Sequence, residues 1–211
     1  MQPILASLPP AWEVIVWDNS RGVTRINNGR KSVWLNQGWI DFGTTQEPAP
    51  RDLSVYGRYA AIAYASHDLI YVADDDCVTD PQQVVQPMLD GAYFDKSAVV
   101  CNMPQEFRHD FYVDHALVGF GACFHRDLPA KAFDRYNNYW LEAPDGTPDA
   151  PDPGVFHNTC DIVFTTLTPR VLVNVSVTSL PYASDPGRMW TTPGHQEERS
   201  RMLELALAVK R

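Results

Sequence analysis

The sequence predicts a single α/β domain over residues 1–211, with a sheet flanked by helices. Short apolar runs typical of buried strands alternate with helical patterns through the first half of the chain. A length of 211 residues is within the usual range of one domain. A composition of 45% hydrophobic and 20% charged residues is enough to form a buried core.

The first predicted strand covers residues 12–17, a short apolar and β-branched run. It ends in polar residues that include Asp18 and Asn19, and α/β sheets bind ligands at the ends of such strands. A second strand is expected at 32–35. Residues 52–65 have apolar side chains at helical spacing and predict a helix that packs on the sheet.

The next predicted strand, residues 68–73, ends in three consecutive acids. Asp74, Asp75 and Asp76 follow the apolar run directly, and the sequence Thr-Asp-Pro at 79–81 then indicates the start of a helix. The acids are therefore expected at the end of an interior strand.

The rest of the chain continues the α/β pattern. We expect strands at 97–102 and 171–177, a loop and strand at 113–124, an exposed loop at 142–154 and a helix at 196–210.

The charge and the apolar patterning exclude some classes of partner. A formal net charge of -9 argues against a broad surface for nucleic acid, although an acidic chain can bind an anionic ligand through a divalent cation. The sequence has neither a signal-peptide pattern nor an apolar run long enough for a membrane span, so we expect a cytoplasmic protein. Its four cysteines form no CxxC pair and are expected to be reduced.

Three adjacent carboxylates at a strand end repel one another unless a cation or hydrogen-bond donors compensate them. A solvated acidic turn is the simpler explanation of such a triplet. The apolar strand before it favours a Mg²⁺ or Mn²⁺ site instead, because the acids then point to a ligand-binding edge.

Two classes of enzyme place acids in this way. The DxDxV pattern of Asp74, Asp76 and Val78 resembles the motif of haloacid-dehalogenase-like phosphatases, with Asp74 as the nucleophile. Those enzymes usually carry the motif on their first strand and a later GDxxxD, whereas here about 70 residues come first and no GDxxxD follows. Another phosphoryl- or nucleotidyl-transfer enzyme, or a non-catalytic nucleotide-sugar-binding module, also remains open.

Several segments resemble, in the same order, those of GT-A glycosyltransferases of the exostosin-like, heparan sulfate-type group. They are VIVWDNS, GRYAAIAYASHDLIYVADDD, GACFHR, NTCDIVF and HQEERS. The resemblance implies a GT-A fold, with a Rossmann-like nucleotide-sugar-binding domain and a mixed sheet. Cys160 stands where those enzymes often have a second acid, so the resemblance does not indicate the substrate.

The resemblance also implies a role for each donor-binding residue. Asp18 and Asn19 would contact the nucleoside, Arg58 the donor phosphates, and Asp74 and Asp75 the ribose and donor sugar. From the residues alone, an Asx-turn remains equally open for Asp18 and a surface ion pair for Arg58.

The remaining roles concern the metal and the reaction. Asp76 and His195 would bind Mn²⁺ or Mg²⁺, Asp161 would face the anomeric carbon, and Arg199 would stabilise the departing diphosphate. A helix cap remains open for Asp161. The resemblance implies a UDP-sugar donor and retention of anomeric configuration, while the acceptor could be a glycan, a small molecule or a modified nucleic acid.

Overall fold

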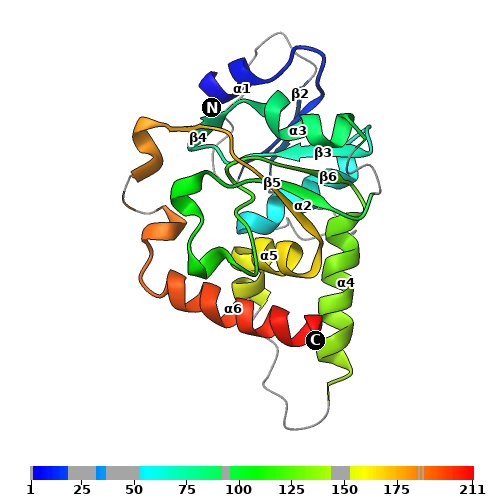
Figure 1. Ribbon diagram of the computed structural model, residues 1–211. Coiled ribbons are helices and arrows are strands. Elements are labelled where there is room, and N and C mark those ends of the chain that lie inside the picture. The colour runs from blue at the N-terminus through cyan, green and yellow to red at the C-terminus, as the bar shows by residue number, and fades with distance from the viewer. Residues whose placement is uncertain are drawn as a thin grey trace, which may run out of the picture.

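The chain is an α/β protein with a mixed sheet flanked by helices, as the sequence predicts (Figure 1). The computed structural model describes residues 2–18, 32–36, 53–91, 96–143, 153–184, 186 and 188–211. The expectation of one domain stays a prediction. No helix within these ranges is both long and apolar enough to cross a bilayer.

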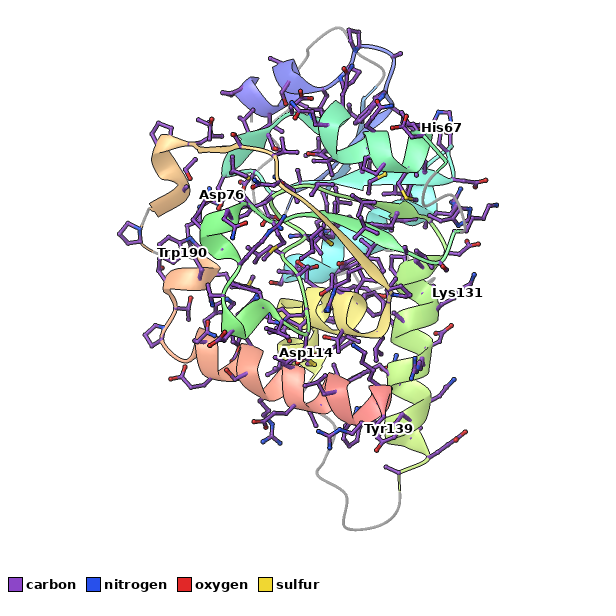
Figure 2. The ribbon with its side chains drawn as sticks, viewed as in Figure 1. His67, Asp76, Asp114, Lys131, Tyr139 and Trp190 are labelled. Atoms are coloured by element: carbon purple, nitrogen blue, oxygen red, sulfur yellow. The ribbon has the colours of Figure 1, made fainter. Side chains whose placement is uncertain are left out.

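The central sheet has four strands in the order β3-β6-β5-β7. They are β3 (Leu69–Val72), β6 (Ala122–His125), β5 (Val99–Asn102) and β7 (Arg170–Val173). Strand β6 is antiparallel to both β3 and β5, and β7 is parallel to β5. Strands β3, β5 and β7 therefore run in one direction and their carboxyl ends meet at one edge. Figure 2 shows His67, which precedes β3, and Asp76, which follows it, on opposite sides of the molecule.

Two small strand pairs accompany this sheet. Strand β1 (Val14–Asp18) pairs in parallel with β2 (Ser32–Asn36), close to the predicted positions. Strand β4 (Cys77–Thr79) pairs antiparallel with β8 (Val177–Ser179). The single strand predicted over 171–177 is thus divided between β7 and β8. Three-residue strands such as β4 are too short to show an alternating pattern in sequence.

The two faces of the central sheet are covered by different helices (Figure 1). Val100 and Cys123 pack in one apolar cluster with α3 (Pro81–Leu89). Phe124 and its neighbours on the other face pack against a second group of helices. These helices are α4 (Leu128–Leu141), α5 (Pro153–Leu167) and α6 (His195–Lys210). Alternate strand residues therefore supply two separate cores, as the pleat of a strand requires.

The helix start predicted at 79–81 is confirmed. The Asp80 side chain accepts a hydrogen bond from the backbone N–H of Gln82 at 3.0 Å, and Pro81 is the first residue of α3. The helix predicted over 196–210 is also confirmed as α6.

The prediction of one helix over 52–65 is wrong in detail. The described part of this segment contains three short turns, namely η1 (Ser54–Tyr56), α2 (Gly57–Ala60) and η2 (Ala61–Tyr64). Trp17 of β1 packs against Gly57, where a Cβ atom would overlap its indole ring. The glycine in mid-segment permits this close approach of β1 but weakens a continuous helix.

The segment that carries Asp161 is part of helix α5, although its short apolar run is equally typical of a strand. Its side chains Cys160, Ile162, Val163 and Phe164 are all 0% exposed. A helix buried on most sides has no single apolar stripe, so its sequence cannot be told from that of a buried strand. Of the loop predicted at 142–154, residues 144–152 lie outside the described residues and the end belongs to α5.

Short helical segments complete the described chain. They are α1 (Gln2–Ser7), η3 (Gln105–Phe107), η4 (Asp110–Tyr112), η5 (Pro181–Ser184) and η6 (Met189–Thr191).

Candidate functional site

The acidic triplet lies just beyond the carboxyl end of β3, held between two other segments. The backbone N–H of Asp74 donates to the Gly119 carbonyl at 2.9 Å, and that of Leu180 donates to the Asp76 carbonyl at 2.8 Å. Gly119 belongs to the loop that enters β6, and Leu180 follows β8. The acids therefore follow the carboxyl end of a strand, as expected, and this is the edge where α/β sheets bind ligands. The expectation of an interior strand is wrong, because β3 is the outermost strand of the described four-stranded sheet and its residues are only half-buried.

Gly119 leaves room for the Asp74 side chain. A Cβ atom at position 119 would overlap the Asp74 carboxylate, so no residue larger than glycine fits without moving that group. The glycine thus permits the position that the Asp74 carboxylate takes beside the loop before β6.

Arg58 joins the triplet to α5. Its guanidinium pairs through Nη2 with Asp74 Oδ1, and Nη1 lies 3.3 Å from Asp161 Oδ2. The side chains of Arg58 and Asp161 are each 17% exposed, and that of Asp74 is 41% exposed. Burial alone would lower the pKa of Arg58, but the charges of Asp161 and Asp74 raise it above its usual value. Arg58 is therefore a permanent cation between two carboxylates from different elements.

Asp161 is held by a second contact from α2. The Tyr59 hydroxyl donates a hydrogen bond to Asp161 Oδ1 at 2.5 Å. Burial raises the pKa of Asp161 above its ordinary value, although Arg58 and the Tyr59 hydrogen bond act in the opposite direction. The carboxylate thus accepts a hydrogen bond at Oδ1 and has the charge of Arg58 beside Oδ2, and it shares Arg58 with the triplet. It does not cap α5, because it lies in the middle of that helix.

The other two acids of the triplet differ in their surroundings. Arg188 Nη1 lies 2.8 Å from Asp75 Oδ1, which places the segment before η6 beside the triplet. Figure 2 shows Trp190 of η6 on the same side of the molecule as Asp76. Asp76 forms no ion pair within the described ranges. Burial, with the nearby charges of Asp74 and Asp75, raises the pKa of Asp76.

The two predicted residues of α6 lie on its first turns. His195 is the first residue of α6, and burial together with the charge of Arg199 lowers its pKa. The neutral imidazole that results is the form that binds metals. The Arg199 guanidinium lies 3.4 Å from Nε2 of His115 and faces the ring of Phe111, with Cζ at 5.8 Å from the ring centre.

A metal at this site would need ligands beyond those of the protein. In the part of the chain that the structure describes, no group of three His, Cys, Asp or Glu side chains is arranged to bind a metal ion. Mg²⁺ commonly binds one or two carboxylates together with substrate phosphates, so a metal carried by a diphosphate would need fewer protein ligands.

The predicted nucleoside contacts are only partly described. Asp18 is the last residue of β1, but its side chain is not described, and Asn19 lies outside the described residues. The preceding Trp17 packs on Gly57, the neighbour of Arg58, so the carboxyl end of β1 lies beside α2.

The sequence did not indicate Tyr59, His115, Gly119 or Arg188 as site residues. Each reaches the site through a tertiary contact, and none belongs to a motif with fixed spacing. The site that results combines acidic and basic side chains from α2, α5, α6 and the loops that follow β3, precede β6 and precede η6. Comparisons with protein-family models, with curated proteins and with solved structures find no match to this chain.

Proposed function

We propose that the chain is a metal-dependent glycosyltransferase of the GT-A type that uses a UDP-sugar donor and retains anomeric configuration. The observation that carries the proposal is the bridge from Arg58 to both Asp74 and Asp161. It joins the acidic triplet, where a donor diphosphate and its metal would bind, to a buried carboxylate suited to face the donor sugar. The resemblance of the sequence to exostosin-like enzymes supports the same assignment.

The chemistry of the triplet fits a divalent cation. Asp76 is half-buried, its pKa is raised by burial and by two neighbouring carboxylates, and a cation would relieve that repulsion. We assign Asp76 and His195 as the residues that would hold Mn²⁺ or Mg²⁺. When bound, the metal would offset negative charge on the leaving diphosphate.

The residues of the chain would act in two groups. Arg199 is a cation whose planar guanidinium group matches phosphate oxygens, so it would orient the diphosphate. Arg58, which we expected at the donor phosphates, is paired with Asp74 and Asp161 and would instead hold these two carboxylates in place. Asp161 accepts a hydrogen bond from Tyr59 at one oxygen and is paired with Arg58 at the other. Such a preorganised carboxylate would stabilise positive charge at the reacting sugar without reorganising during the reaction.

A thermal-shift screen tests the donor site. With saturating Mn²⁺, UDP at a hundred times its dissociation constant should stabilise the fold by about 2.7 kcal/mol. For a chain of this length that corresponds to a melting temperature about 5–10 °C higher. Uridine, which lacks the diphosphate, is the matched control ligand. If no nucleoside diphosphate raises the melting temperature, the proposal is wrong.

Activity assays then separate the proposal from its alternatives. We expect the chain to hydrolyse or transfer from at least one UDP-sugar in the presence of Mn²⁺, and glycans, small molecules and modified nucleic acids can be compared as acceptors. Cleavage of simple phosphoesters that is lost in Asp74→Asn would indicate a phosphatase instead. Binding of UDP-sugar without any turnover would indicate a non-catalytic module.

A further inference from the structure

Arg199 is held at the site by groups that carry no negative charge. Its guanidinium lies 3.4 Å from His115 Nε2 and faces the ring of Phe111. No carboxylate within the described residues forms an ion pair with it. Its charge still reaches the site, because Arg199 is among the influences that oppose the effect of burial on the pKa of Asp161. Arg199 is therefore a cation whose charge is available to an anionic ligand.

His115 can hold Arg199 only as a neutral acceptor. An arginine side chain has donors and no acceptor, so His115 Nε2 must accept and its proton must sit on Nδ1. Burial, with the charges of Arg199 and Arg170, lowers the pKa of His115 to about 3, which keeps the ring neutral. Residue His115 is 1% exposed, and its Nδ1 has no hydrogen-bond partner among the described groups.

The backbone on both sides of His115 is fixed. Arg170 Nη2 donates to the Val113 carbonyl at 3.0 Å, and the Ala116 N–H donates to Thr165 Oγ1 at 3.0 Å. The Thr165 hydroxyl in turn donates to the Asp161 carbonyl at 2.8 Å. His115 is therefore held at a set position relative to the helical turn that carries Asp161.

An unpaired buried polar atom in a fixed loop costs stability. Two aromatic rings pack against His115, with centroids 4.8 Å away for Phe111 and 5.0 Å away for Tyr112. A phenylalanine could make these ring contacts without burying an unpaired N–H. The packing therefore does not require histidine, whereas the contact with Arg199 requires an acceptor.

We propose that His115 is the positioning residue of Arg199, which it holds as an unneutralised cation facing the Asp161 site to bind a diphosphate. The choice of diphosphate as the ligand rests on the proposed function. An acidic residue at position 115 would also fix Arg199, but it would pair with the charge that the ligand needs. A neutral acceptor fixes the guanidinium and leaves that charge available.

Two substitutions separate positioning from packing. His115→Phe keeps an aromatic ring but removes the acceptor, whereas His115→Gln places an amide oxygen near the position of Nε2 but removes the ring. Affinity for inorganic pyrophosphate with Mg²⁺ is measured by calorimetry. Arg199→Gln is the reference for complete loss of the contribution of Arg199 to that affinity. Melting temperatures are measured for all variants.

We expect pyrophosphate to bind about tenfold more weakly to His115→Phe than to the wild-type chain, which is close to the loss in Arg199→Gln. The reason is that a mispositioned Arg199 no longer makes its charge-assisted hydrogen bond to the ligand. His115→Gln should recover most of the affinity. The melting temperatures should follow the opposite order, because the phenylalanine variant keeps the ring contacts and removes the unpaired donor. A purely structural role would instead make affinity follow stability.

The outcomes distinguish this inference from the proposed function. Wild-type affinity in His115→Phe, equal losses in the two His115 variants, or no binding of pyrophosphate by the wild-type chain would overturn the positioning role. If the predicted order of affinities is found but no nucleotide sugar is turned over, the positioning role stands and the glycosyltransferase proposal fails.

Discussion

Replacing Arg58 with methionine tests the feature on which the site depends. The change keeps an unbranched side chain in the same space but removes the cation between Asp74 and Asp161. Removal of one partner from a buried ion pair costs about 3–5 kcal/mol, because the other charge stays buried and unpaired. We expect about 3 kcal/mol, the lower limit, since the Asp74 side chain is 41% exposed and water can solvate it. That loss corresponds to a melting temperature about 6–12 °C lower.

The loss of stability should depend on pH in a defined direction. Burial already raises the pKa of Asp161, and removing Arg58 removes the main opposing influence, so the pKa should rise further. A carboxyl group whose pKa is higher in the folded state favours folding when protonated, and this contribution is lost as pH rises through the folded-state pKa. The deficit of Arg58→Met should therefore be larger at pH 8 than near the ordinary aspartate pKa of about 4.

Two further variants identify the cause of the effect. Arg58→Met combined with Asp161→Asn should recover stability at pH 8, because the asparagine is uncharged and can still accept the Tyr59 hydrogen bond. Arg188→Met is the matched control, since its partner Asp75 is 54% exposed. Loss of that exposed pair should cost at most about 1 kcal/mol.

Urea denaturation followed by fluorescence at several pH values measures all four proteins. The reasoning is refuted if the double variant is no more stable than Arg58→Met at pH 8, or if Arg188→Met is as unstable as Arg58→Met. A deficit that does not change with pH would also contradict the role given to Asp161.

Two other substitutions address the metal and the reaction. Asp76→Asn should abolish metal-dependent turnover of UDP-sugars but raise the stability of the metal-free protein near neutral pH. The pKa of Asp76 in the wild-type chain is raised, so the ionised carboxylate opposes folding and the gain in stability should vanish at acid pH. Full activity of the variant would show that Asp76 is not part of the site. Asp161→Asn should reduce turnover far more than UDP affinity, because its contact with the sugar matters chiefly in the transition state. Turnover and UDP affinity are measured side by side, and equal losses in both would make Asp161 a simple donor contact.

The short-range features of this fold could be predicted from the sequence with good accuracy. The apolar run before Asp74 and the Thr-Asp-Pro sequence after it each depend on neighbouring residues alone, and both β3 and the start of α3 are observed. Strand β1 was also predicted close to its observed bounds, because an apolar run that ends in polar residues is a local pattern.

Elements that are buried on most sides, or whose shape depends on contacts with distant residues, were predicted less well. Helix α5 resembled a strand because its buried residues occupy most sides of the helix and leave no amphipathic period. The broken helix at 54–64 contains Gly57, whose contact with Trp17 comes from a distant strand. Helix propensity depends only on neighbouring residues, so it cannot predict such a contact.

The α/β class and the position of three acids after a strand follow from the order of residues along the chain, so the sequence was sufficient to predict both. That β3 is the outermost strand of its sheet could not be predicted, because it depends on which strands pair. That Arg58 lies between Asp74 and Asp161, and that His115 contacts Arg199, is seen only in the folded chain. These contacts join residues far apart in sequence. Their geometry depends on the packing of α2 and α6 against α5, and no pattern of spacing within the chain encodes it.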